Sequence, residues 1–271
     1  MDKKLLWPVI LAGLLGLAII FYPRPTPEPP PQPLDLPEPA PTTSPLFVPD
    51  PDPEPAPEFL AVDLPEALPP LPALDDSDAD ARAALAGAAG EALVDQHLVP
   101  DDVIRKLVAT VDNLPREALW IKSRAVPPVE GRLLVEGPEG ARVLSPANFL
   151  RYTPLVQLVG AVDARALASA YRRHYPLLQQ AYEELGYPGR QFHNRVLEVI
   201  DHLLATPAVD GPIRLEQPHV LYTFADPRLE ALSPGQKILL RVGPENAAVL
   251  RARLIELRAA LEERPATPDA D

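Results

Sequence analysis

The sequence contains no cysteine, and this absence excludes functions and modifications that require a thiol. Without cysteine the chain has no disulfide support, no thiol nucleophile and no acceptor for an amino-terminal lipid. Gly-x-Gly, Gly-x-Ser-x-Gly, phosphate-loop and His-Glu-x-x-His motifs are missing as well, and these motifs mark nucleotide, acyl-transfer and zinc sites. We therefore expect no catalytic residues, no metal and no cofactor.

Basic residues are few relative to acidic ones. The chain has 25 Lys and Arg against 38 Asp and Glu, which gives a formal net charge of −13 at pH 7. Because nucleic-acid binding requires a basic surface, we expect no nucleic-acid partner.

An uncharged run of 18 residues extends from Leu5 to Tyr22. A helix of this length covers about 27 Å, close to the ~30 Å hydrocarbon core of a bilayer. We predict a membrane anchor in residues 1–22 that spans the lipid bilayer at about 5–22, with a cytoplasmic amino terminus. Positive charge on the inner side and aromatic rings at the interface support this orientation, and the residues concerned are Lys3, Lys4, Trp7 and Tyr22.

A cleaved signal peptide is the alternative for this run. Its apolar part exceeds the usual ~7–15 residues, and no small residues follow it as a cleavage site. The sequence therefore favours an uncleaved anchor. Ala12 and Gly16 form a small-xxx-small pair that also permits a homodimer through the span.

Residues 23–73 have the composition of a spacer. The segment between Pro23 and Pro72 holds 20 of the 38 prolines, nine acidic residues and one basic residue. Because it has little apolar surface to bury, we expect a disordered, polyproline II-like linker. At ~3.1 Å per residue it reaches on the order of 150 Å.

Residues 74–264 have the length and patterning of one compact, mainly α-helical domain, followed by an acidic tail at 265–271. Caps, prolines and apolar spacing predict helices over 77–86, 91–98, 103–113, 163–185, 192–205 and 244–263, with further starts at Ser145, Thr153, Asp226 and Ser233. We expect Pro176 to kink or split its helix. Turn signals predict two minor β-hairpins, at 132–144 and 213–224.

Several runs of this domain resemble a bacterial family catalogued as domain of unknown function 3014. The similarity covers nearly all of residues 74–263 and is carried by Val111-Asp112-Asn113-Leu114-Pro115-Arg116, Arg151-Tyr152-Thr153-Pro154, Val199-Ile200-Asp201-His202-Leu203-Leu204, and Phe224-Ala225-Asp226-Pro227 through Gly243-Pro244-Glu245-Asn246. The resemblance implies an amino-terminal span, a proline-rich spacer and a Gram-negative envelope location. It implies no activity, because none is assigned to the family.

Residues 171–202 hold the densest group of aromatic, arginine and histidine side chains. Two helices joined by the turn at 188–189 are expected to line a groove for a carboxylate or phosphate on a partner or glycan. The alternative is that the tyrosines are core residues. The candidate binding surface comprises Tyr171, Arg172, Tyr175, Tyr182, Tyr187, Arg190, Arg195, Glu198 and His202.

Within that surface, Arg195, Glu198 and His202 share one flank of a helix. They form either a structural salt-linked trio, or a functional site in which Glu198 and His202 are an acid/base pair or two ligands of a metal. Two ligands alone do not make a zinc site. The remaining histidines of this stretch, His174 and His193, are expected to be exposed.

These observations predict a membrane-tethered interaction or structural module in the periplasm, which binds an envelope protein or a cell-wall partner. The alternative is an enzyme or binding protein acting on cell-wall or glycan material, with Arg195, Glu198 and His202 as its site.

Overall fold

The computed structural model describes residues 53–57, 59, 69–91, 94–95, 98–116, 125, 132–160 and 162–263. No helix within these ranges is long and apolar enough to cross a membrane. The predicted span at 5–22 with its flanking residues, the small-residue pair inside it and the tail at 265–271 lie outside the described residues.

The domain is mainly α-helical with two small antiparallel hairpins, as predicted. The elements in chain order are η2 (Leu74–Asp76), α2 (Asp78–Ala89), α4 (Val103–Asn113), β1 (Val135–Glu136), β2 (Val143–Leu144), α5 (Ala147–Gly160), α6 (Ala164–Glu184), α7 (Phe192–Leu204), β3 (Leu215–Glu216), β4 (Thr223–Phe224), α8 (Pro227–Glu230), α9 (Pro234–Arg241) and α10 (Pro244–Glu262).

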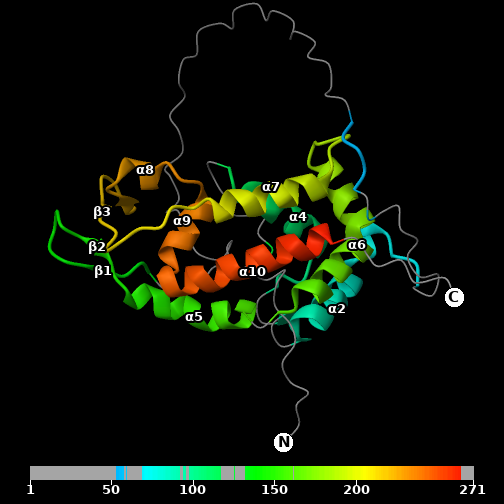
Figure 1. Ribbon diagram of the computed structural model, residues 1–271, viewed down its shortest axis with the longest axis horizontal. Helices are drawn as coiled ribbons and strands as arrows, with labels where there is room; N and C mark the ends of the chain where they lie inside the picture. Colours follow the sequence, from blue (N-terminus) through cyan, green and yellow to red (C-terminus); the bar gives the residue numbers. More distant parts are fainter. Residues whose placement is uncertain are drawn as a thin grey trace, which may run out of the picture.

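Helix α10 runs through the middle of the domain (Figure 1). It packs against α5, α6, α7 and α9, while α4 packs against α2, α6 and α7. The apolar stripe predicted for α10 faces this core, since Leu250, Leu254, Leu257 and Leu261 are all buried. The main core therefore forms around a helix whose leucines recur every three or four residues.

The two predicted hairpins are confirmed and lie together at one end of the domain, beside α8 (Figure 1). Val143 and Arg214 form an antiparallel bridge that joins one hairpin to the other. A second apolar cluster lies beneath them, formed by Leu144, Leu215, Phe224 and Leu240. Neither two-residue pair of strands is stable alone, so this shared cluster explains why both form.

The helix start predicted at Thr153 is wrong, because α5 continues through Pro154. Proline lacks an N–H and disturbs the preceding turn of a helix. The N–H that Pro154 lacks would have paired with the Leu150 carbonyl. The neighbouring Phe149 carbonyl accepts hydrogen bonds from the Thr153 hydroxyl at 3.1 Å and from the Asn246 amide of α10 at 3.0 Å. Asn246 thus ties this turn of α5 to α10.

In two further places the structure differs from a local prediction, because the cap expected before α2 does not form and α6 is not split at Pro176. The Ser77 hydroxyl donates to the Leu74 carbonyl at 2.7 Å and does not cap α2, and Asp80 contacts His174 of α6. Pro176 does not split α6, which is one helix of 21 residues.

Candidate functional site

Three tyrosines of the candidate binding surface are core residues. Tyr171, Tyr175 and Tyr182 of α6 are 6%, 1% and 3% exposed, and burial raises the pKa of the Tyr175 hydroxyl to about 12. Tyr187, in the turn after α6, is half-buried and stacks on Tyr182 with ring centroids 4.6 Å apart. The structure therefore has the alternative arrangement, in which these rings pack inside the domain.

Arg195 of α7 binds a buried carboxylate at the end of α4. Its Nε donates to Asp112 Oδ1 at 2.9 Å, and its Nη2 donates to the Asp112 carbonyl at 2.9 Å. Asp112 Oδ2 accepts from Arg116 Nη2 at 2.7 Å and from the Tyr187 hydroxyl at 3.2 Å. We call these four residues the Asp112 cluster. Asp112 is 4% exposed, so two guanidinium groups compensate a charge that water hardly reaches.

Glu198 and His202 do not contact the same group. Glu198 is exposed, with Oε2 3.3 Å from Arg195 Nη1. His202 Nε2 lies 2.8 Å from Ser233 Oγ, the cap of α9. Burial, and then the charge of Arg195, lower the pKa of His202, which keeps its imidazole neutral at pH 7. This arrangement favours a structural role over an acid/base pair.

The prediction that His174 and His193 are exposed is wrong, since they are only 6% and 8% exposed. His174 Nε2 lies 2.7 Å from Asp80 Oδ2 and its Nδ1 lies 2.8 Å from the Ala170 carbonyl. It therefore links α6 to α2. Burial is the main cause that lowers the pKa of His193.

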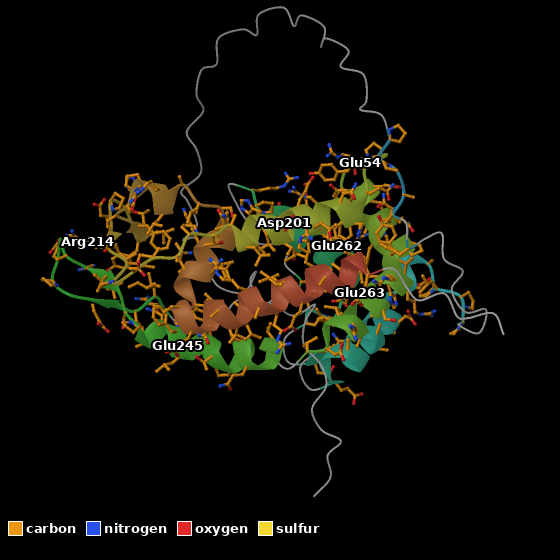
Figure 2. All side chains as sticks on the ribbon, in the orientation of Figure 1. Glu54, Asp201, Arg214, Glu245, Glu262 and Glu263 are labelled. Carbon is orange, nitrogen blue, oxygen red and sulfur yellow. The ribbon has the colours of Figure 1, made fainter. Side chains whose placement is uncertain are left out.

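Part of the predicted spacer, residues 53–57 and 59, lies against α6, α7 and the turn between them. We call these residues the docked segment. Glu54 is its polar anchor (Figure 2). Its carboxylate accepts from the Gln191 backbone N–H at 2.9 Å and from Asn194 Nδ2 at 2.9 Å, and lies 3.1 Å from Arg190 Nε. These groups lower the pKa of Glu54, with the Gln191 hydrogen bond as the largest cause.

Gln191 occupies the N-cap position of α7 without a side-chain cap hydrogen bond, at a place where helix geometry leaves unpaired N–H groups and a positive partial charge. The docked segment also pairs through its backbone, because the Glu54 N–H donates to the Gly189 carbonyl at 2.8 Å. Gln191 Nε2 donates to the Glu54 carbonyl at 3.3 Å. The turn therefore recognises both the side chain and the backbone of one residue.

Phe59 provides the apolar contact of the docked segment. Its ring meets Tyr175 at 5.2 Å and His193 at 5.0 Å between centroids, in edge-on geometry, and Tyr171 at 6.2 Å. The Arg172 guanidinium lies 6.0 Å from the centre of the same ring. We call these four partners the aromatic box. The tyrosines and Arg172 of the candidate surface thus hold a residue of the chain itself.

Asp112, Glu54 and Phe59 were missed in the sequence. Asp112 lies in the first of the runs that resemble the family, so the resemblance carried a signal for it. Glu54 and Phe59 belong to an acidic, proline-rich stretch whose composition indicated disorder. Within the described ranges, no group of three or more His, Asp or Glu side chains is arranged to hold a metal.

Comparison with known proteins gives one result. A family model described as Protein of unknown function (DUF3014) matches residues 103–258, which is more than half of the chain and includes the Asp112 cluster. No curated protein and no solved structure matches.

Proposed function

Because this chain belongs to the DUF3014 family, to which no function is assigned, we propose a role from its geometry: a membrane-tethered interaction module of the bacterial envelope. Residues 5–22 hold it in the inner membrane, and the helical domain is presented in the periplasm to an envelope protein or cell-wall partner. A tether confines the domain near its anchor and raises its effective concentration for partners in that zone.

This proposal rests on the contacts that the polar side chains of residues 171–202 make. Arg195 binds Asp112, His202 binds Ser233, and Arg190 binds Glu54. These contacts hold parts of the chain together. They favour an interaction module over an enzyme of cell-wall material, because the acid/base pair which that enzyme would need is not assembled among these residues.

The length of the tether provides the test. We would delete residues 23–47, crosslink the full-length protein in cells and quantify what it captures. We expect the captured partner to be lost with the shortened tether and recovered when the deleted residues are replaced by a scrambled sequence of the same length. Unchanged far-UV circular dichroism controls for folding. Undiminished capture with the short tether would contradict the proposal.

Glu198→Gln separates the proposed role from catalysis. Glu198 forms a surface ion pair and its side chain is 57% exposed, so its neutralisation should change stability by less than about 1 kcal/mol and leave capture intact. Loss of activity or capture at unchanged stability would instead favour a catalytic or ligand-binding carboxylate.

A further inference from the structure

The docked segment is bound at two points five residues apart, a carboxylate at Glu54 and a ring at Phe59. We propose that the α6–α7 face is a binding site for an extended peptide that carries this acidic-aromatic pair. The docked segment of the same chain, residues 53–57 and 59, occupies the site as a releasable latch.

The carboxylate half of the site has the features of specific recognition. The Glu54 carboxylate contacts three donors from Arg190, Gln191 and Asn194, and its backbone pairs with Gly189. Gly189 has a φ of +75°, a conformation in which a side chain is strained, and a Cβ there would make an ordinary van der Waals contact with Pro53 at 3.5 Å. The backbone conformation of the turn therefore favours glycine at the residue whose carbonyl accepts the Glu54 N–H.

The aromatic half adds contact area that a surface ion pair lacks. Edge-on rings at 5–7 Å stabilise one another beyond their burial, and a guanidinium over a ring adds a cation–π contact. Prolines 53, 55 and 57 alternate with Glu54 and Ala56 and precede Phe59. They hold the segment extended before it binds, which reduces the entropy lost on binding.

The same contacts are weak enough to release. The Arg190 side chain is 47% exposed, and Pro53, Pro55 and Ala56 are exposed. Ion pairs with an exposed partner contribute little to stability. The latch is held because it is covalently attached, which gives an effective concentration on the order of millimolar. A partner peptide of the same chemistry at comparable local concentration displaces it.

Release of the latch lengthens the free part of the tether. This consequence rests on the proposed function, whereas the proposal of a peptide-binding site does not depend on it. With the latch closed, the free spacer is residues 23–52, which extend to about 90 Å at ~3.1 Å per residue. With the latch open, residues 23–68 reach about 140 Å, because the Pro69 carbonyl still accepts from Arg173 and Leu71 still packs against the core. Binding of a partner would thus let the domain move farther from the membrane.

The absence of native cysteine allows two spin labels to test the latch in the full-length protein. We would introduce Ala56→Cys in the docked segment and Glu245→Cys in α10; Glu245 is far from Glu54 in Figure 2. Both positions are exposed. We expect a narrow interspin distance distribution that becomes broad when Glu54→Gln and Phe59→Ala are added.

Matched controls are Glu38→Gln and Phe47→Ala, which make the same changes elsewhere in the spacer and should leave the distribution narrow. A broad distribution in the parent protein, or a narrow one after the two latch substitutions, would overturn the latch.

A peptide of residues 50–61 tests the site itself. Fluorescence anisotropy should show that it binds the full-length protein carrying Glu54→Gln and Phe59→Ala at least about tenfold more tightly than the parent, whose own segment competes. The same peptide with Glu54→Gln should bind at least about tenfold more weakly. Failure of the native peptide to bind the unlatched protein would overturn the site and leave the tether experiment unaffected.

Discussion

Replacement of Asp112 by alanine should be among the most destabilising changes outside the apolar core. Asp112 is 4% exposed, and the side chain of Arg195 is 22% exposed. Asp112→Ala leaves this guanidinium partly buried without its carboxylate, and removing one partner of a buried pair costs about 3–5 kcal/mol. Arg195 keeps its hydrogen bond to the carbonyl of residue 112, so we expect the lower end, about 3 kcal/mol.

For a domain of this size, that loss lowers Tm by about 6–12 °C. We would follow the far-UV circular dichroism of the full-length protein in mild detergent during thermal and urea unfolding. Asp95→Ala is the matched control. Asp95 is helical and its Oδ1 lies 2.6 Å from Arg82 Nη2, but its side chain is 67% exposed. It should cost less than about 1 kcal/mol.

A double-mutant cycle with Arg195→Met isolates the pairwise interaction. If the variant at position 112 loses no more stability than the variant at position 95, the idea that burial makes the Asp112 cluster important is refuted.

Three other outcomes follow from the structure. Ser233→Ala removes the cap of α9 and the partner of His202, and should reduce the free energy of unfolding by about 1–2 kcal/mol in urea titrations; a smaller loss for Ser233→Thr would support the cap. Gly243→Ala should cost more than about 2 kcal/mol, because φ is +88° and the new Cβ overlaps the Phe149 ring; a Tm equal to that of the parent would contradict this. Burial lowers the pKa of both His193 and His202, so the folded state binds protons less well than the unfolded state. Stability should therefore be full above pH ~6.5 and fall as the pH drops below that value, and a Tm at pH 5 equal to that at pH 7.5 would contradict it.

The sequence predicted residues of the candidate site but not the groups that they bind. Arg190 and Arg195 were expected to bind carboxylates, and they do, but the carboxylates are Glu54 and Asp112 of the same chain. Residue type and helical spacing indicate that an arginine will seek an anion. They contain no information on which anion the fold brings to it.

The sequence alone determined the features that depend on near neighbours. The cap at Ser233, the helix that starts at Asp163 and the start of α10 after Gly243 all occur as predicted, because a cap or a positive φ involves groups only a few residues apart.

The tertiary structure decided everything that joins distant residues. Arg195 and Asp112 are 83 residues apart, and Gln191 and Glu54 are 137 apart. Helix α5 is tied to α10 where the Asn246 amide donates to the Phe149 carbonyl, 97 residues away. In each case the stabilising energy comes from contact with a partner that tertiary packing brings close. No local pattern in the sequence predicts which partner that is.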